Sequence, residues 1–452
     1  MTRRGALMEI ARRDLLLTLA GAACARPAFA GVAPWRAGVA SVDITPPPGL
    51  WMAGYAARKE PAQGATQPLH AKALALRDGA ERTVVIATLD VLGLTAPVVE
   101  RIAGEVARRF GLPRSGLVLC SSHTHSGPVI DDQLAIAYPL TPAQWDAIRQ
   151  STRRIEGQVV EAVGAALYSP RPVRLRFGQA SAGFAANRRT AFPGGPVDPA
   201  VPVLSIEREE GDLLGVLFGY ACHNTTLPPT FVQYHGDYAG VAQAELERRH
   251  QGALALYVAG CGADANPSPR GTLELAEQHG RALADAVERA MDGSAAVTGR
   301  LDAAFGTAVL DYAPAPPADT WRARLSDENV YVRRHAALML DVIAREGRVQ
   351  AFERAPLHVV RIGQVTFVAI SGEVVVDYSF AVKRLGGQGT WVAGCTDAVF
   401  GYLPSRRILR EGGYEGGEAM LYYGRPGPFA DTVEASVMHR IEALLSATRR
   451  SD

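Results

Sequence analysis

The chain has 452 residues, of which 48% are hydrophobic and 21% are charged. This composition is typical of a globular protein with enough apolar residues to build a large core. The formal net charge is only +1, which excludes the strong basic excess expected of a nucleic-acid-binding protein.

We expect residues 1–30 to be a signal peptide rather than part of the fold. Arg12 and Arg13 precede an apolar run and then a small-residue cleavage motif, Ala28-Phe29-Ala30. Adjacent arginines are typical of twin-arginine signals, and the apolar run is too short to span a membrane. We therefore predict export to the periplasm or the medium. We also predict a single mature catalytic domain, residues 31–452, without a transmembrane segment.

Beyond the signal, short apolar runs repeatedly end at polar or ionisable residues. Their length and their lack of alternation are typical of strands buried on both faces. The runs are Thr83 to Leu89, Leu117 to Cys120, Leu213 to Cys222, Ala253 to Ala259, Val365 to Ile370 and Thr390 to Ala393. Hairpin-like stretches at Val173 to Phe177 and Val203 to Glu207 argue against a purely parallel sheet.

Amphipathic segments lie between these runs. The clearest, Val98 to Phe110, has apolar residues at helical spacing and ends before Gly111. Thr141 and Pro142 predict the cap and first turn of a helix toward Leu167. Further helices are expected at Ala239 to His250, Leu273 to Met291, Trp321 to Glu346 and Thr432 to Ala447. The pattern predicts an α/β fold with a mixed β-sheet core flanked by helices, and a site at the C-terminal ends of strands.

Three histidines follow two of the predicted strands. His123 and His125 are two residues apart, and residues at this spacing in a strand face the same way. They are candidate zinc ligands, although such a pair also satisfies loop backbone groups. His223 is either another ligand or a buried, hydrogen-bonded histidine. Asp237, close to it in sequence, is a candidate to accept its second ring N–H.

Glu373 is a further candidate metal ligand, whereas the cysteines are not. Glu373 follows Ser-Gly at a predicted strand end, where glycine lets the backbone turn and aim the carboxylate inward. The alternative is an acid that caps a helix. The four cysteines beyond the signal show no CxxC spacing, so we interpret them as small residues packed beside the site rather than as zinc ligands.

The motifs occur in one particular order. SSHTHSGP at residues 121–128 is followed by His223, the loop GCGADANP at 260–267, Ser-Gly-Glu at 371–373 and Gly-Tyr-Leu-Pro at 401–404. With Asp-Ile-Thr-Pro-Pro at 43–47 and Gly-Tyr at 54–55, the chain resembles the catalytic domain of the neutral/alkaline (non-lysosomal) ceramidase family. The similarity extends from about residue 40 to about residue 447.

The resemblance implies a site with one Zn²⁺. Its ligands would be His123, His223, Glu373 and Tyr402. His125 would lie beside the metal, where it donates to a substrate carbonyl or shuttles a proton; which of the two motif histidines ligates is left open, with His123 preferred. Arg188 belongs to an Asn-Arg pair that the family shares, and is expected to contact the substrate.

The chain departs from the ceramidase pattern in two places. Asn266 stands where those enzymes carry the serine assigned as nucleophile, and an amide side chain can only donate or accept hydrogen bonds. Ser268 lies two residues further on, so the nucleophile is either water or Ser268. We also expect the chain to lack the immunoglobulin-like C-terminal domain of ceramidases, because the similarity ends near residue 447.

These observations predict a zinc-dependent hydrolase of N-acyl amide bonds, in which metal-activated water attacks the carbonyl. Glu373, His125 or Asp264 would take the proton, and Asn266 and Tyr402 would stabilise the oxyanion. The predicted partner is a small-molecule N-acyl or ester substrate, lipids included. Two alternatives remain: an exported, non-catalytic metal- or ligand-binding protein on the same scaffold, and a metal hydrolase that acts on a non-lipid ester or amide.

Overall fold

The computed structural model describes residues 35–189 and 194–449, which belong to one compact unit. The predicted signal peptide, residues 1–30, lies outside the described residues. No helix in the described part of the chain combines the length and apolar character that crossing a membrane requires.

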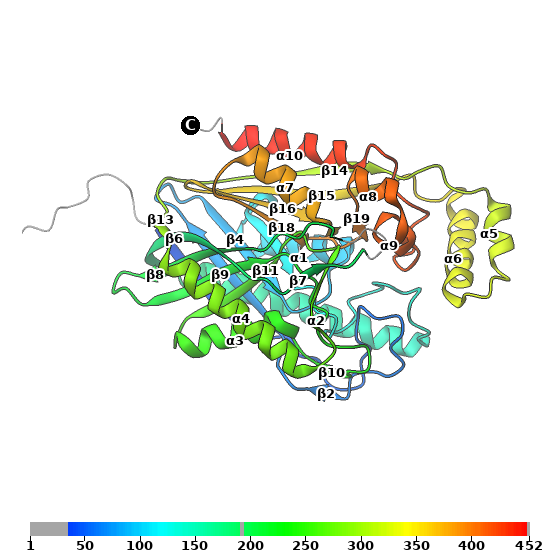
Figure 1. Cartoon of the computed structure of the whole chain (residues 1–452), viewed down its shortest axis with the longest axis horizontal. Helices are drawn as coiled ribbons and strands as arrows, with labels where there is room; N and C mark the ends of the chain where they lie inside the picture. Colours follow the sequence, from blue (N-terminus) through cyan, green and yellow to red (C-terminus); the bar gives the residue numbers. More distant parts are fainter. Residues whose placement is uncertain (1–34, 190–193, 450–452) are drawn as a thin grey trace, which may run out of the picture. The chain divides into compact units, whose positions relative to one another are not determined.

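Strands and helices alternate along the described chain, as the hydrophobic pattern predicts (Figure 1). The strands are β1 (Trp35–Asp43), β2 (Gly64–Ala65), β3 (His70–Arg77), β4 (Thr83–Leu89), β5 (Leu117–Ser121), β6 (Arg171–Ser181), β7 (Ala185–Asn187), β8 (Ala200–Arg208), β9 (Leu213–Tyr220), β10 (Gln233–Tyr234), β11 (Leu254–Ala259), β12 (Ala265–Pro267), β13 (Ala295–Ala296), β14 (Leu301–Asp311), β15 (Phe352–Ile362), β16 (Val365–Ser371), β17 (Glu373–Val374), β18 (Thr390–Thr396) and β19 (Tyr402–Leu403). The α-helices are α1 (Ala96–Phe110), α2 (Pro142–Tyr168), α3 (Asp237–Arg249), α4 (Leu273–Asp292), α5 (Ala318–Arg324), α6 (Val330–Glu346), α7 (Val376–Gly386), α8 (Arg406–Glu411), α9 (Gly413–Gly416) and α10 (Val433–Arg449), with short 3₁₀ turns η1 (Arg114–Gly116) and η2 (Glu418–Leu421).

One large sheet forms the centre of the fold. Among the described residues it has thirteen strands, in the order β11-β9-β8-β6-β1-β3-β4-β5-β18-β16-β15-β14, with β13 paired to β6. The pairs β4–β5, β9–β11 and β16–β18 are parallel, whereas the remaining neighbours along this path are antiparallel. The α/β fold with a mixed sheet is therefore confirmed.

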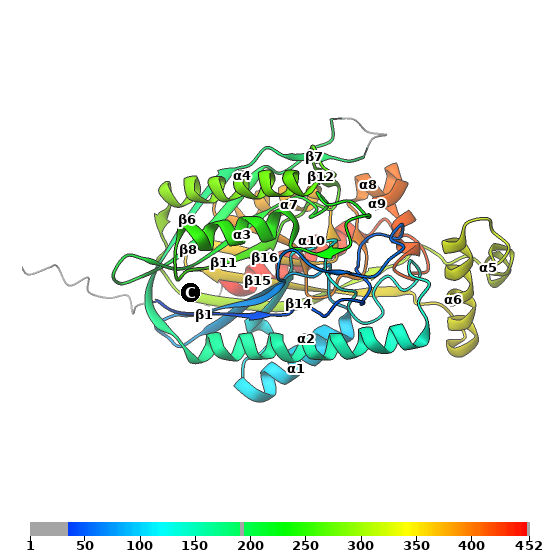
Figure 2. The same cartoon turned by 90° about the horizontal axis from the view of Figure 1, so that it is seen from below.

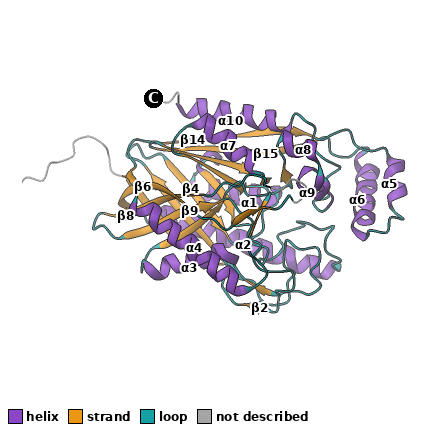
Figure 3. Cartoon of the chain, viewed as in Figure 1, coloured by secondary structure: helices purple, strands orange, loops and turns teal. Residues whose placement is uncertain are grey.

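The sheet curves so that one of its faces packs against itself. An apolar cluster combines residues of both halves, among them Leu74 on β3, Val258 on β11 and Phe367 on β16. Helices cover the outer faces: α1 and α2 pack on β3 and β4, α3 and α4 pack beside β8 and β9, and α7 and α10 pack on β15 and β16. Figures 2 and 3 show the strands between these helical layers.

The structure corrects one predicted helix. The segment from Trp321 to Glu346 is not continuous but forms the hairpin of α5 and α6. The side chain of Asn329 accepts a hydrogen bond from the backbone of Tyr331 and caps α6, and Asp327 accepts one from Asn329. Because Asp and Asn side chains satisfy backbone N–H groups in turns and caps, they end the first helix and start the second.

The curvature brings several strand ends together. Residues of the predicted site follow the C-terminal ends of β5, β9, β11, β16 and β18. This arrangement agrees with the sequence-based prediction that the polar residues gather at the C-terminal ends of the strands.

Candidate active site

His123 and His125 lie in the loop after β5 and not in a strand. His123 has φ of +62°, in the left-handed region that residues with side chains rarely adopt. The expectation that strand alternation aims both rings the same way is therefore wrong, although both rings do reach one place, with centroids 5.1 Å apart. The Nδ1 atom of His123 lies 2.7 Å from the carbonyl oxygen of Leu92, which leaves Nε2 to face the site.

His223 comes to the same place from the end of β9. A β-bridge between Thr124 and Asn224 joins the loop of His123 to the loop of His223. The Nδ1 atom of His223 lies 2.9 Å from the carbonyl oxygen of Gly262. Asp237 does not hold this imidazole, contrary to the prediction. Its carboxylate instead accepts backbone N–H groups, one of them from Leu227 at 2.9 Å, because Asp237 begins α3 and faces the loop before it.

Glu373 and Tyr402 are brought side by side by a short parallel ladder. β17 pairs with β19 so that Glu373 is directly opposite Tyr402. Gly372 has φ of +85°, and a Cβ at this position would lie 2.9 Å from the ring of Phe400, so the turn into β17 requires glycine. The ladder therefore explains how two residues 29 positions apart in sequence present a carboxylate and a phenol to one point.

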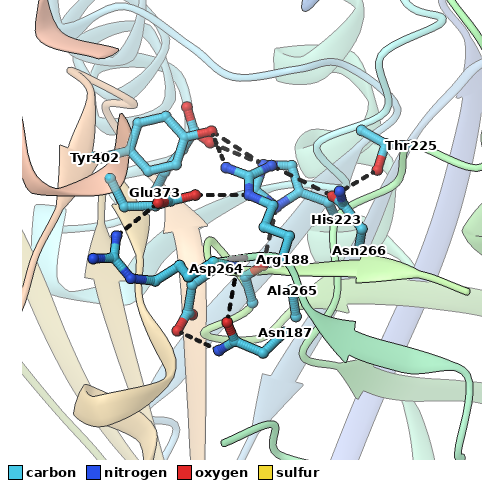
Figure 4. A network of polar contacts seen from close by, with 12 residues as sticks. Asn187, Arg188, His223, Thr225, Asp264, Ala265, Asn266, Glu373 and Tyr402 are labelled. Atoms are coloured by element: carbon cyan, nitrogen blue, oxygen red, sulfur yellow. Dashed lines mark hydrogen bonds and ion pairs between the residues drawn. The ribbon is translucent and has the colours of Figure 1, made fainter. Parts of the chain in front are cut away.

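The four expected metal ligands converge. Glu373 Oε2 lies 3.0 Å from His223 Nε2 and 3.1 Å from His123 Nε2, and the Tyr402 hydroxyl lies 3.4 Å from His223 Nε2. All four residues are buried. Figure 4 shows His223, Glu373 and Tyr402 turned toward one another.

The donor atoms fit a metal ion. The imidazoles of His123, His125 and His223 each offer a nitrogen, and these atoms lie within 4.8 Å of one another. The Nε2 atom of His123 is close to Glu373 but not aligned for a hydrogen bond, and both ring nitrogens of His125 are buried without a partner. Buried polar atoms normally have partners, so the unpaired nitrogens of His123 and His125, beside His223 and the Glu373 carboxylate, form a donor set that fits a divalent ion.

Two of the expected ligands, His223 and Glu373, have protonation states that suit a metal. Burial, followed by the charge of Arg188, lowers the pKa of His223 to about 4. Burial and the neighbouring imidazoles lower the pKa of His125 well below its usual value. Burial would raise the pKa of Glu373, but His123 and His223 outweigh it and hold this pKa well below its usual value. The neutral ring of His223 and the ionised carboxylate of Glu373 are forms that bind metal. Burial would also lower the pKa of His123, but Cys395 and the Glu373 carboxylate outweigh it and hold this pKa well above its usual value, so a bound cation would displace a proton from this ring.

Arg188 and Asn266 are placed beside the ligands by a second small ladder. β7 pairs antiparallel with β12, and the backbone N–H of Arg188 donates to the carbonyl of Asp264 at 2.8 Å. The guanidinium of Arg188 donates to the Tyr402 hydroxyl at 2.8 Å, to Asn266 Oδ1 at 3.4 Å and to Glu415 at 2.8 Å (Figure 4). Arg188 was expected to contact the substrate; its observed contacts orient the residues around the ligands.

Asn266 is held in one orientation. Its Oδ1 accepts from Arg188 and, at 3.2 Å, from the hydroxyl of Thr225. Arg188 and Thr225 both donate hydrogen bonds to the amide oxygen. The Nδ2 group of Asn266 is therefore left to donate to another acceptor. The residue at the position of the family serine is therefore arranged as a hydrogen-bond donor, whereas Ser268 is exposed at the surface.

Asp264 lies next to the site, but its carboxylate faces away from the imidazoles. One oxygen accepts from the backbone N–H of Val376 at 2.9 Å and the other from the Asn187 amide at 3.2 Å (Figure 4). Burial raises the pKa of Asp264 to about 6. These contacts tie the 260–267 loop to the start of α7, which supports β17 and so the position of Glu373.

Two features of the site escaped the sequence analysis. The hydroxyl of Tyr423 donates to Glu373 Oε1, the carboxylate oxygen that does not face the histidines. Gly54 lies so close to His125 that a Cβ at this position would be 2.3 Å from His125 Nδ1. Tyr423 sits in a Tyr- and Gly-containing loop with no periodicity, so no local pattern indicates it. The Gly54-Tyr55 pair was recognised only as part of the resemblance, without a role.

Comparison with known proteins identifies the family and agrees with the fold. The model of the family described as "Neutral/alkaline non-lysosomal ceramidase, N-terminal" matches residues 35–261. The neutral ceramidase from Pseudomonas aeruginosa superposes with a TM-score of 0.73 at 18% identity, over 93% of this chain and 75% of that one. A second structure, described as a ceramidase complexed with C2, gives a TM-score of 0.73 at 17% identity, over 93% and 76%. No curated protein matches the sequence significantly.

Proposed function

Because this chain belongs to the neutral/alkaline non-lysosomal ceramidase family, we propose that it is an exported, zinc-dependent hydrolase of N-acyl amide bonds. The observation that carries the proposal is the convergence of His123, His223, Glu373 and Tyr402 on one buried point. An N/O donor set with two imidazoles favours Zn²⁺. When bound, such an ion would acidify a water molecule and polarise the scissile carbonyl.

The surrounding residues have separable roles in this proposal. His125 has a neutral ring and unpartnered nitrogens beside the ligands, so it takes the proton that the attacking water loses. Asn266 donates from Nδ2 to the developing oxyanion. Arg188 holds Tyr402 and Asn266 in place, and Glu415 neutralises its charge. Water is the nucleophile, because the side chain at the family serine position has no hydroxyl.

The metal is tested together with the substrate class. The purified protein is analysed for bound metal and assayed against N-acyl amides, ceramides among them, and the corresponding esters, with and without a chelator. We expect about one Zn²⁺ per chain and chelator-sensitive amide hydrolysis. Substitutions His123→Ala and His223→Ala should each abolish both. Wild-type zinc content and turnover in both variants would refute the proposal.

The Asn266 role gives a sharper test. Asn266→Asp keeps the shape but removes the N–H donor, so kcat should fall by about 10²–10³-fold. Thr225→Val removes the hydroxyl that orients the amide and should lower kcat by about tenfold, whereas Thr225→Ser keeps the hydroxyl and should retain most activity. If Asn266→Asp has wild-type kcat, Asn266 is not the donor.

One observation favours a second function. The loss of the serine hydroxyl at Asn266 is also what a scaffold that binds metal or ligand without catalysis would show. That protein would contain zinc but turn over no acyl substrate in a chelator-sensitive way. A metal hydrolase of non-lipid amides or esters differs from the leading proposal only in its substrates, so the same panel separates the two.

A further inference from the structure

The large sheet consists of two halves that meet at β5 and β18. The ladder between these two strands has one residue pair, in which Thr396 is opposite Cys120. The neighbouring ladders, β4–β5 and β16–β18, each extend over several pairs. Because ladder pairing sets the register of strands, a joint of one pair by itself specifies the relative position of the two halves only weakly.

The proposed metal ligands come from both halves. His123 and His223 follow β5 and β9 in one half, whereas Glu373 and Tyr402 follow β16 and β18 in the other. Glu373 Oε2 lies 3.1 Å from His123 Nε2 across the division. Ligand distances in metal sites vary by only about 0.2 Å, so the two halves must be held in one position for the four residues to share an ion.

A charged cluster of Arg114, Asp397 and His358, the joint cluster, crosses the division beside the single pair. Asp397 follows β18, and its backbone N–H donates to the carbonyl of Leu119 on β5 at 2.7 Å. Its Oδ1 accepts from the backbone N–H of Leu119 at 3.4 Å. Asp397 has φ of +48°, a left-handed conformation that Asp adopts more readily than most residues with a Cβ. Asp397 therefore ties the end of β18 to β5 through both its backbone and its side chain.

The other carboxylate oxygen of Asp397 contacts residues from both sides of the joint. Nη2 of Arg114, in η1 directly before β5, lies 2.7 Å from Asp397 Oδ2. Nε2 of His358, on β15, lies 2.8 Å from the same oxygen. Arg114 also donates to the carbonyl of Leu117 at 2.8 Å, and its guanidinium lies over the Phe305 ring of β14 at 4.5 Å. The guanidinium therefore contacts β5, β14 and the end of β18 at once.

The joint cluster is suited to fixing a position rather than to adding stability. Asp397 and His358 are fully buried, and His358 is on the same face of β15 as Val360, part of the apolar cluster inside the curved sheet. Burial would raise the pKa of Asp397, but His358 and Arg114 outweigh it and lower this pKa, so the carboxylate is ionised. Burying charges is costly even when they are paired, and apolar residues of similar volume are often as stabilising. Directional bonds to a charge, unlike apolar contacts, define one arrangement of the segments that carry them.

We propose that Arg114, Asp397 and His358 position the metal site, by holding the half of the sheet that supplies its two imidazoles in register with the half that supplies its carboxylate and phenol. The bonds of the joint cluster go to strands, so it acts on the ligands through the backbone. The inference rests on the metal site of the proposed hydrolase and extends it, because it assigns the geometry of that site to residues outside it.

The test compares two buried, paired carboxylates. Asp397→Asn removes the charge at the centre of the joint cluster and keeps the shape. Asp78→Asn is the matched control, because Asp78 is buried, pairs with Arg82 at 2.7 Å and accepts from the backbone of Leu301 at 2.9 Å. Asp78 follows β3 at the end of the sheet opposite the ligands, since β3 and β4 are antiparallel. Thermal unfolding verifies that each variant is folded.

Binding of Co²⁺ to the metal-free proteins gives a readout that does not depend on catalysis. The visible absorption of bound Co²⁺ reports the geometry of its ligands, and a titration gives the dissociation constant. We expect Asp397→Asn to change this spectrum and to bind Co²⁺ at least about tenfold more weakly, as when the orientation of ligands is disturbed. Asp78→Asn should keep the wild-type spectrum and an affinity within about twofold of wild type. A wild-type spectrum and affinity for Asp397→Asn would overturn the proposal.

A double variant separates positioning from stability. Asp397→Asn leaves the Arg114 guanidinium without its carboxylate, whereas Arg114→Gln combined with Asp397→Asn removes both charges. We expect the double variant to have a higher Tm than Asp397→Asn but to keep the altered spectrum and the weaker binding. A spectrum that returns to the wild-type form together with the Tm would show that the cluster only stabilises the fold. Should Asp397→Asn not fold, the double variant is compared with Asp78→Asn by the same measurements.

The same measurements keep this inference separate from the proposed function. If the wild-type protein binds Co²⁺ but hydrolyses no amide, the hydrolase proposal fails, and the spectra still decide the role of the joint cluster. If the wild-type protein hydrolyses amides and Asp397→Asn matches its spectrum and affinity, only the positioning role is refuted. A wild-type protein that binds no Co²⁺ would refute the metal site and the positioning role with it.

Discussion

Gly54 determines how closely the chain approaches His125. Its φ is +97°, and a Cβ would lie 2.3 Å from Nδ1 and 2.5 Å from Cγ of the imidazole. We expect Gly54→Ala to displace His125 and to lower kcat/KM by at least about tenfold, the loss typical of a misplaced proton-transfer group. Gly49→Ala is the matched control, because Gly49 has φ of +98° with nothing within 4 Å.

Both glycine variants have a side chain in a left-handed conformation, which costs about 1–2 kcal/mol of stability each. The comparison of kcat/KM between them therefore isolates the contact with His125. If Gly54→Ala and Gly49→Ala have the same activity, His125 is not needed at its observed position.

Asp264 makes the stability of the protein depend on pH. Burial raises its pKa from 3.8 to about 6, so the folded state binds the proton more tightly than the unfolded state. The resulting stabilisation is fully present below about pH 4 and is lost as the pH rises through 6, up to about 3 kcal/mol. Asp264→Asn has no such titration. Its unfolding free energy, relative to that of the wild type, should therefore increase from pH 4 to pH 7.

The measurement for Asp264 is urea unfolding at the two pH values. Asp319→Asn serves as the control, since its carboxylate is exposed and the charge change is the same. The difference in unfolding free energy from the wild type should depend on pH for Asp264→Asn but not for Asp319→Asn. Parallel pH dependence of Asp264→Asn and the wild type would show that this carboxyl does not titrate as its burial implies.

At the scale of the elements, the strand β6 and the helix α4 come into close contact at Gly178. A Cβ at this position would lie 1.9 Å from the carbonyl oxygen of Ala290 near the end of α4. Because this oxygen belongs to the backbone, the helix and strand must separate to admit a methyl group. We expect Gly178→Ala to destabilise the protein by about 2–3 kcal/mol, measured as a fall in the urea midpoint with unchanged slope.

Gly183→Ala is the control for the strand–helix contact, because Gly183 lies just beyond β6 and has nothing within 4 Å. It should change the unfolding free energy by less than about 1 kcal/mol. A wild-type midpoint for Gly178→Ala would mean that α4 does not pack on β6 as closely as the structure has it.

At the scale of the whole molecule, the proposed metal ligands come from distant segments of the chain. They follow β5, β9, β16 and β18 and span residues 123 to 402. A ligand that binds only the folded state stabilises it by mass action, by about 2.7 kcal/mol at one hundred times its dissociation constant. We therefore expect Zn²⁺ to raise the Tm of the chelator-treated protein by several degrees.

The same addition of Zn²⁺ should leave the Tm of His223→Ala nearly unchanged, because the four-ligand site is then incomplete. Thermal unfolding with and without the ion checks this in both proteins. An equal rise in Tm for wild type and variant would place the ion elsewhere on the molecule.

Local patterns in the sequence determined the elements and the candidate ligands. The boundaries of β4 and α1 follow from apolar runs and a terminal glycine, because these signals depend on neighbours in the chain. His123, His223, Glu373 and Tyr402 were named from motifs whose order matches the family. The break between α5 and α6 was missed although a run of polar residues, Ser326 to Asn329, interrupts the apolar pattern there and supplies the cap of α6.

Only the tertiary structure decided how these residues meet. The partners of His223, the orientation of Asn266 and the contact of Tyr423 with Glu373 all join residues far apart in sequence. Their contacts depend on the curvature of the sheet and on the ladders β7–β12 and β17–β19, each only two or three residues long per strand. Such short pairings have no periodicity of their own, since they form only when the surrounding core has already brought the loops together.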